Sequence, residues 1–245
     1  MTAWYSAFAW LFDPVNWAGP GGIPARVGEQ LLYTVVTLVI AAVIAVPIGM
    51  AIGHTGKGRG LAVQLSGVLR ALPTLGVLLL LALLLGLGFG PALIVMVVLA
   101  LPPLLAGAYA GVDAVDRETI DAAKSIGMTG WQVLVKVELP LSLPIIIGGV
   151  RSACLQVIAT WTVAAILPLG GLGRFMYDAL PLGDYPQLLA GSILVIVLAL
   201  VADAVFAITQ KLVVPRGVAA GRVGEVRVTT NRRSVRAGTN GQTAA

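Results

Sequence analysis

The chain has 245 residues, of which 58% are hydrophobic and only 11% charged, and its formal net charge is +5. Soluble domains have about a quarter of their residues charged, so this composition excludes an ordinary soluble enzyme and indicates an all-α integral membrane protein. The positive charge is concentrated in loops and in the tail, so it does not indicate a nucleic-acid partner.

Residues 1–28 are rich in Trp, Tyr and Phe and are interrupted by Pro14, Pro20 and Pro24. This segment is too short and too broken to span a bilayer, and Trp and Tyr favour the membrane interface. We predict a short interfacial helix followed by a loop, in which the aromatic side chains anchor the chain; a recognition role is the alternative. No basic stretch precedes the apolar residues, so no cleavable signal peptide is expected.

About five apolar stretches follow, each close to the ~20 residues that a helix needs to cross the hydrocarbon core. The predicted spans cover 31–52, 61–87 or 72–87, 92–111, 144–167 and 188–212. Residues 54–60 form a basic, glycine-rich connection, for which a short turn is preferred over a phosphate-binding loop. Because a charge at mid-membrane costs ~2.5–3.5 kcal/mol, Arg70 near the start of the second span is expected at the interface. The length leaves no room for an additional ATPase domain.

Two of the spans carry unusual residues. The pair Pro102 and Pro103 should kink or unwind the third span. The fourth span is the most polar, and such a helix should face protein or a water-filled path rather than lipid. Gln156, Thr160 and Trp161 are therefore candidates for lining a translocation path, with structural hydrogen bonds between helices as the alternative.

Charged side chains within the spans are few. Arg151 lies in the fourth span and Asp203 in the fifth, each toward the same end of its helix. We expect these two side chains to form an ion pair; a pair between Asp203 and Arg70 is the alternative.

Gly170, Gly171 and Gly173 open a loop that extends to residue 187 and includes a predicted short helix over 174–180. From residue 215 the chain is polar and rich in arginine. Such a segment cannot bury enough apolar surface to fold alone, so we predict a disordered tail, with binding to anionic lipid as the alternative. The predicted organisation is an interfacial segment (1–28), a transmembrane domain (29–214) and a basic tail (215–245).

The basic residues are distributed unevenly between the two sides of the membrane. With the N-terminus outside, the outer side receives only Arg26 and Arg174. The inner side then receives Lys57, Arg59, Arg117, Lys124, Lys136, Lys211 and the arginines of the tail. The positive-inside rule therefore predicts an outside N-terminus and a cytoplasmic C-terminus, and it places the connection 113–140 in the cytoplasm.

That connection contains a patterned stretch of small residues. Ala123 and Gly127 are four positions apart, so on one helix they would share a face that lets another protein come close, with Ala122 beside them. An apolar stripe at helical spacing follows, formed by Trp131, Leu134, Val135 and Leu139. Gly130 is expected to separate two short helices and Pro140 to end the second, which would brace the connection on the membrane domain.

This stretch resembles the cytoplasmic coupling loop of bacterial ABC-importer permeases. The family pattern is Glu-Ala-Ala, three residues, Gly, nine residues and Ile-x-Leu-Pro. Asp121 and Val137 replace the Glu and the Ile, and the remaining positions match at Ala122, Ala123, Gly127, Leu139 and Pro140. The resemblance implies a methionine-importer-type permease fold, in which Asp121 caps the coupling helix or pairs with a cation of the ATPase. An ordinary loop helix rich in small residues is the alternative.

The resemblance also implies partners and a location. These are a separate ATP-binding subunit that hydrolyses ATP, a second permease copy or a sibling permease, an extracellular solute-binding protein and the lipids of the bacterial inner membrane. The chain itself would be a non-catalytic transport subunit without a cofactor. In agreement with this, the sequence has one cysteine and one histidine, which exclude a disulfide framework and a metal-ligand cluster.

Residues 72–180 resemble the osmoprotectant branch of the family, which imports glycine betaine, carnitine, choline or proline. The resemblance rests on residues 70–73, 136–144 and 170–173. Importers of methionine share the plan and are the alternative. An ion-driven secondary transporter would need intramembrane acids, for which Asp203 alone is thin support. No aromatic cage for a quaternary amine is evident, because Trp161 is nearly alone among the spans, so selectivity is expected to reside in the binding protein.

Overall fold

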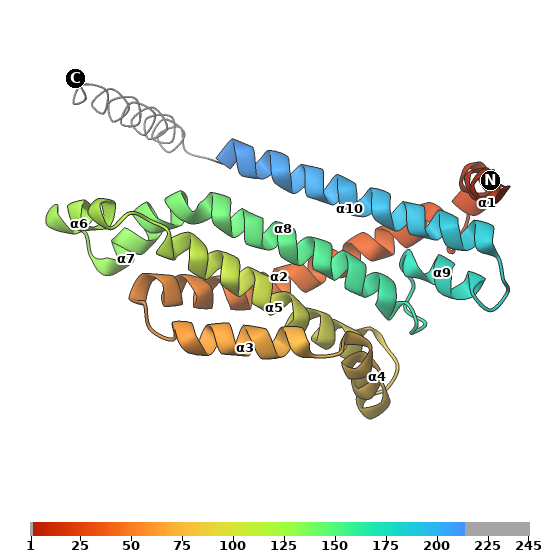
Figure 1. Ribbon diagram of the computed structural model, residues 1–245, viewed down its shortest axis with the longest axis horizontal. Helices are drawn as coiled ribbons and strands as arrows, with labels where there is room; N and C mark the ends of the chain where they lie inside the picture. The colour runs from red at the N-terminus through yellow and green to blue at the C-terminus, as the bar shows by residue number, and fades with distance from the viewer. Residues whose placement is uncertain (1, 214–245) are drawn as a thin grey trace, which may run out of the picture.

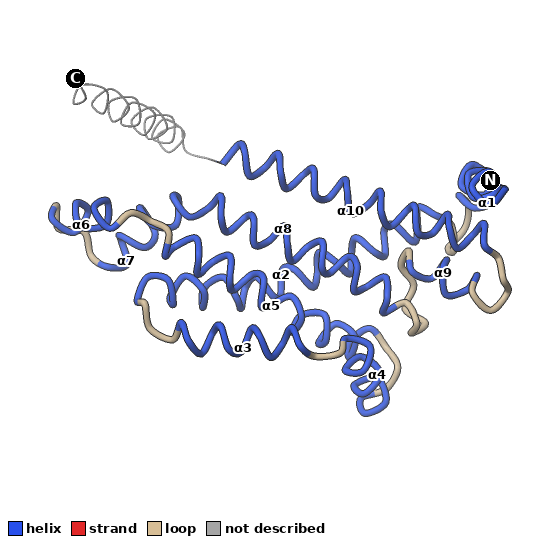
Figure 2. The backbone as a smooth tube through the Cα atoms, in the orientation of Figure 1, coloured by secondary structure: helices blue, strands red, loops and turns tan. Residues whose placement is uncertain are grey.

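The structure is a computed structural model, and it describes residues 2–213 (Figure 1). Within that range all regular structure is helical, as the tube representation shows (Figure 2). The tail predicted over 215–245 lies outside the described residues. In chain order the elements are α1 (Thr2–Phe12), η1 (Pro14–Trp17), α2 (Ile23–Thr55), α3 (Arg59–Ala71), α4 (Thr74–Leu85), α5 (Phe89–Asp113), α6 (Arg117–Ser125), α7 (Gly130–Val133), η2 (Leu134–Glu138), α8 (Leu139–Ala164), α9 (Gly173–Ala179) and α10 (Tyr185–Val213).

Among the described residues, four helices are long and apolar enough to cross a membrane, namely α2, α5, α10 and the continuous helix 130–164 that contains α7, η2 and α8. The pair α3 and α4 passes the same test together but bends by 81° at its break, so it forms a broken span or a re-entrant loop. The bend lies at Leu72 and Pro73, where the proline ring disfavours a helical conformation of the preceding residue. The expectation of about five spans is confirmed.

The first span is longer than predicted. α2 has 33 residues and begins at Ile23, inside the stretch predicted to be a loop. Pro24 stands in its first turn, where a missing N–H costs nothing because that group has no partner inside the helix. This proline therefore starts the helix rather than breaking it. As a consequence Arg26, Glu29 and Gln30 belong to α2 and are placed on its first turns.

The helices α2, α5 and α8 form the centre of the molecule. A Cβ added to Gly107 of α5 would lie 2.6 Å from the Cα of Gly149 in α8, and one added to Gly49 of α2 would lie 2.7 Å from the Cβ of Ala108. Only small residues permit helices to approach this closely in a membrane. The bundle core is filled by Ala41, Ala45, Val95, Met96, Ala100, Ala153, Val157, Trp161 and Ala164.

The pair Pro102 and Pro103 does not unwind α5, which continues as a helix from Phe89 to Asp113. Pro103 has no N–H to donate to the carbonyl of Leu99 four residues earlier. Gln156 of α8 supplies the missing donor, since its Nε2 lies 3.0 Å from that carbonyl oxygen. Neighbouring side chains commonly satisfy such freed carbonyls in membranes, which explains why the helix persists.

Candidate functional site

Residues 117–140, called the motif segment here, lie at one end of the bundle, where Figure 1 shows α6 and α7. The side chain of Asp116 caps α6 by accepting a hydrogen bond from the N–H of Glu118 at 3.0 Å. Asp121 is therefore not the residue that caps this helix, and of its two expected roles only pairing with a cation of the ATPase is left. It lies in the middle of α6 with an exposed side chain, next to the exposed Ala122.

Ala123 and Gly127 do not share a helical face as predicted. α6 ends at Ser125, and Gly127 follows it with φ +87°, a left-handed conformation. The N–H of Gly127 donates to the carbonyl of Lys124 at 2.9 Å, and the N–H of Met128 donates to that of Ala123 at 3.2 Å. These two bonds make a Schellman motif, the common glycine-dependent end of a helix. The spacing of four residues thus reflects a helix terminus and not a continuous stripe.

Ala123 also points the other way from the prediction. It is only 7% exposed and packs inward against Val115, Ile120 and Val133. A Cβ added to Gly127, by contrast, would meet nothing within 4 Å. Ala122 and Gly127 therefore lie open to a partner, whereas Ala123 is part of the small core that holds α6 against α7.

The second half of the motif segment also departs from the prediction. Pro140 does not end a helix, because α7, η2 and α8 form one continuous helix. η2 is a π-helical turn, and the N–H of Leu139 reaches back to the carbonyl of Leu134. Such a wider turn directly before Pro140 relieves the clash between a proline ring and the preceding turn. Trp131 is 73% exposed in the described part of the chain, so it is not a buried brace against the membrane domain, whereas Val133 and Leu134 are buried.

A polar contact that the sequence did not predict joins the motif segment to α2. Glu138, at the end of η2, is 2% exposed, and its Oε2 lies 2.6 Å from Nδ1 of His54 in the last turn of α2. The other ring nitrogen, Nε2, lies 3.5 Å from the position of a Cβ added to Gly130. The imidazole therefore lies between the first residue of α7 and the last of η2.

The three candidates for a translocation path all make hydrogen bonds inside the protein. Gln156 satisfies the carbonyl of Leu99, and Thr160 donates to the carbonyl of Gln156. Trp161 is 3% exposed and donates from Nε1 to Oγ1 of Thr37 in α2 at 2.9 Å. This arrangement favours the structural alternative that the polarity of the fourth span left open.

Trp161 is not alone among the aromatic residues of the spans. Its ring stacks on that of Phe89, with centroids 5.7 Å apart, and both rings lie against Tyr33, with centroid distances of 5.0 Å. The three residues come from α8, α5 and α2. Because the rings contact each other, they leave no room for a quaternary ammonium group between them.

The structure brings Arg151 of α8 and Asp203 of α10 together. Nε of Arg151 lies 2.5 Å from one carboxylate oxygen of Asp203, and Nη2 lies 2.6 Å from the other. Arg70, the alternative partner, is exposed on α3. Within residues 2–213, no group of three or more His, Cys, Asp or Glu side chains could hold a metal ion.

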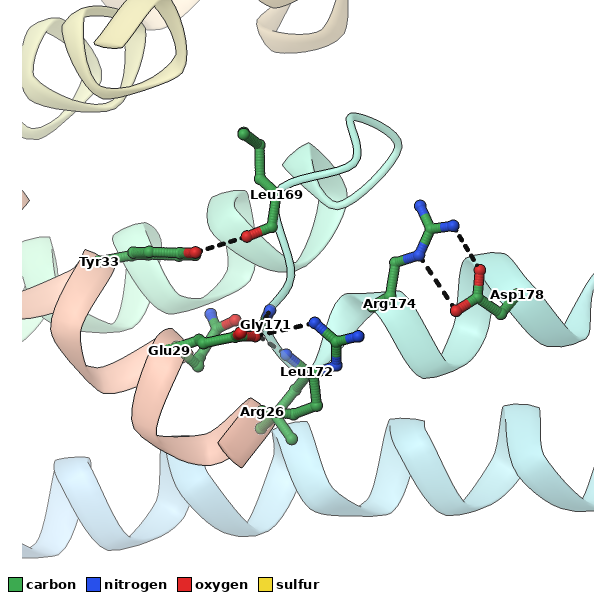
Figure 3. A network of polar contacts seen from close by, with 9 residues as sticks. Arg26, Glu29, Tyr33, Leu169, Gly171, Leu172, Arg174 and Asp178 are labelled. Atoms are coloured by element: carbon green, nitrogen blue, oxygen red, sulfur yellow. Dashed lines mark hydrogen bonds and ion pairs between the residues drawn. The ribbon is translucent and has the colours of Figure 1, made fainter. Parts of the chain in front are cut away.

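At the opposite end of the bundle, residues 169–173 form a glycine loop that is bound to the first turns of α2 (Figure 3). Oε2 of Glu29 accepts a hydrogen bond from the N–H of Gly171 at 2.8 Å, and the hydroxyl of Tyr33 donates to the carbonyl of Leu169. Oε1 of the buried Gln30 accepts from the N–H of Leu172 at 3.3 Å, while its Nε2 donates to the carbonyl of Ile158 at 3.1 Å.

The glycines of this loop are required by its geometry. Gly170 and Gly171 have φ of +90° and +77°. A Cβ on Gly170 would clash with the Glu29 carboxylate, and one on Gly171 would lie 2.7 Å from Oε1 of Gln30. The sequence points to the glycines but not to their partners, because Glu29 and Gln30 follow a stretch that is predicted to be a loop.

Comparison with known proteins agrees with the fold. Residues 27–217 match the family described as the binding-protein-dependent transport system inner membrane component. The chain is 32% identical over 197 residues to the glycine betaine/carnitine/choline transport system permease protein OpuCB of Bacillus subtilis, an alignment that covers 80% of this chain and 91% of that protein. It is 30% identical over 189 residues to the choline transport system permease protein OpuBB of the same organism, which covers 77% and 87% respectively.

Solved structures show the same architecture. A crystal form of the inward-facing MetNI methionine ABC transporter superimposes with a TM-score of 0.71 at 20% identity, covering 82% of this chain and 98% of that one. The predicted methionine-importer-type fold is thus confirmed, together with the predicted inner-membrane location. The chain therefore belongs to the family of inner-membrane components of binding-protein-dependent transport systems.

Proposed function

We propose that this chain is the permease subunit of an ATP-driven importer for osmoprotectants such as glycine betaine, carnitine, choline or proline. The observation that carries the proposal is the alignment over most of the chain with permeases whose names specify glycine betaine, carnitine or choline. The likeness to the methionine transporter, at 20% identity, supports the fold and not a methionine substrate.

The proposed partner of the motif segment is a separate ATPase subunit. α6 presents the exposed Asp121 and Ala122, and the large apolar side chains of Ile126 and Trp131 are 81% and 73% exposed on either side of Gly127. Exposed apolar groups beside an open glycine suit a protein partner in contact with this surface. Closure of two ATPase subunits on ATP would move the docked segments and switch the permease between inward-open and outward-open states.

In this proposal the N-terminus is outside, the motif segment is cytoplasmic and the glycine loop faces the extracellular solute-binding protein. A second copy of this chain or a sibling permease completes the pathway, and ATP is hydrolysed only by the partner. The alternative of an ion-driven carrier loses its main support, because Asp203 is paired with Arg151 and is not a free relay acid.

Uptake of labelled glycine betaine tests the proposal, in cells that lack this chain and other osmolyte importers. Wild-type chain should restore uptake, and Gly127→Asp should insert normally but fail to restore it. Gly127→Asn is the matched control, because Asn, like Asp, can adopt the left-handed conformation but adds no charge. Uptake of methionine and not glycine betaine by the rescued cells would contradict the substrate, and full rescue by Gly127→Asp would contradict the docking role.

A further inference from the structure

The helix α2 contacts both ends of the molecule through polar side chains. Gln30 binds the glycine loop near the start of α2, and His54 contacts Glu138 of the motif segment in its last turn. At 1.5 Å per residue these two positions are separated by about 36 Å along the helix axis, which is more than the hydrocarbon thickness of a bilayer. Figure 1 shows α2 extending between the end that carries α7 and the end that carries α9.

The contact at His54 links the motif segment to α2, in addition to the continuous helix that joins the segment to α8. Glu138 is almost completely buried, and a buried carboxylate without a partner is unfavourable because it has lost its hydration. Its hydrogen bond to the imidazole therefore favours one placement of η2 relative to α2. The same ring also lies near Gly130, since its Nε2 would be 3.5 Å from a Cβ added there, so the ring adjoins the start of α7 as well.

Close packing next to this contact prevents α2 from sliding independently. A Cβ added to Gly53 would lie 2.7 Å from the Cβ of Val112 in α5, and Gly49 is equally close to Ala108. Interdigitated interfaces of this kind move as bodies or switch between discrete arrangements; they do not deform gradually. A displacement of α2 at His54 should therefore reach its other end.

We propose that His54 is a positioning residue which ties the motif segment to α2, and that α2 carries the movement of that segment to the glycine loop. The inference rests on the proposed function, since it takes the motif segment to be moved by an ATPase. It adds a specific route: Glu138 to His54, along α2, and then through Glu29, Gln30 and Tyr33 to the backbone of residues 169–172.

The test uses the complete complex with its ATPase in lipid nanodiscs and a fluorescent reporter beside the glycine loop. Cys154, which is buried in α8, is replaced by Ala, and the exposed Pro168 is replaced by Cys and labelled with an environment-sensitive fluorophore. Emission is compared without nucleotide and after trapping with ATP and vanadate. In the labelled protein with His54 and Glu138 unchanged, the emission should shift when ATP and vanadate are added.

The informative variant is the double substitution His54→Ala with Glu138→Leu, which removes the contact without leaving a buried carboxylate unpaired. It should retain the ATPase subunit and hydrolyse ATP, while the emission shift and solute uptake fall about tenfold. His54→Asn, whose side-chain amide can donate a hydrogen bond to the intact Glu138, should retain both the emission shift and the uptake. Thr55→Val is the matched control, because the hydroxyl of the neighbouring Thr55 donates to the carbonyl of Ala51 and accepts from the N–H of Lys57, and neither of these partners belongs to the motif segment.

A wild-type emission shift and wild-type uptake in the double variant would overturn the inference while leaving the proposed function intact. Absence of any nucleotide-dependent shift with intact His54 and Glu138 would overturn the inference as well. If in that case Gly127→Asp also imports solute normally, the docking role of the motif segment fails with it.

Discussion

The two ends of α2 are held to the rest of the chain in different ways. At the motif segment, one side chain bonds another, His54 to Glu138. At the glycine loop, the side chains of Glu29, Gln30 and Tyr33 bond to backbone groups, and the loop contributes little but its conformation. The first contact therefore depends on two side-chain identities, whereas the second depends on glycines that allow the backbone to approach. At the motif end, substitutions of the two paired side chains should lower the stability most, whereas at the glycine loop substitutions of the glycines should lower it most.

The largest effect is expected where a glycine has both a left-handed backbone and a close neighbour. Gly171→Ala would strain φ +77° and push against Oε1 of the buried Gln30, and we expect it to cost about 3 kcal/mol of stability. Gly127→Ala has a similar φ of +87° but open space around the new Cβ, so it should cost only about 1 kcal/mol. Thermal unfolding of the two purified proteins measures the difference. Equal melting temperatures would show that the glycine loop is not packed as tightly as described.

The next effect is at the motif end. His54→Ala leaves the carboxylate of Glu138 buried without its partner, and we expect a loss of about 2–3 kcal/mol. Glu138→Leu combined with it should recover much of this loss in thermal stability, because no unpaired group remains. A double variant less stable than His54→Ala would contradict the view that the cost comes from the orphaned carboxylate.

A smaller effect is expected for a single bond at the glycine loop. Tyr33→Phe removes only the hydroxyl that donates to the carbonyl of Leu169 and keeps the ring contacts with Phe89 and Trp161. The expected loss is about 1 kcal/mol, since one hydrogen bond disappears from a partly buried site. Tyr33→Leu, which also removes the ring, should be clearly less stable than Tyr33→Phe; equal stability would argue against a role for the aromatic cluster.

The smallest effect concerns a pair that belongs to neither end. Asp203→Asn weakens the bidentate contact with Arg151, and because both side chains are about one-third exposed, we expect only a modest fall in melting temperature. Arg70→Gln, at an exposed arginine, is the matched control and should leave the melting temperature unchanged. A fall for Arg70→Gln as large as that for Asp203→Asn would point to general effects of charge and not to this pair.

The sequence predicts those features that depend on local composition. Apolar length defines the spans, and the pairing of Arg151 with Asp203 follows from two isolated charges in apolar helices. Inferences that extended a helical period across a terminus were wrong. Gly127 was assigned to the face of Ala123, although a glycine just after a lysine-bearing helical turn is also the signal of a helix end.

Other errors came from applying the behaviour of soluble helices to a membrane bundle. Pro140 is expected to stop a helix, yet a π-helical turn accommodates it. Of the two effects expected of Pro102 and Pro103, a kink or an unwinding, the unwinding does not occur, and Gln156 satisfies the carbonyl that Pro103 leaves without a donor. The contact between His54 and Glu138 joins residues 84 positions apart and leaves no periodic trace in the sequence. Its one local sign is that each is an ionisable residue at the end of an apolar stretch.

The most direct test of the central claim is ATP-dependent accumulation of labelled glycine betaine in proteoliposomes that contain this chain, its ATPase subunit and the solute-binding protein. We predict accumulation with ATP by the wild type, and none by Gly127→Asp under the same conditions. Accumulation without ATP, or equal accumulation by Gly127→Asp, would contradict the claim that the motif segment couples an ATPase to osmoprotectant import.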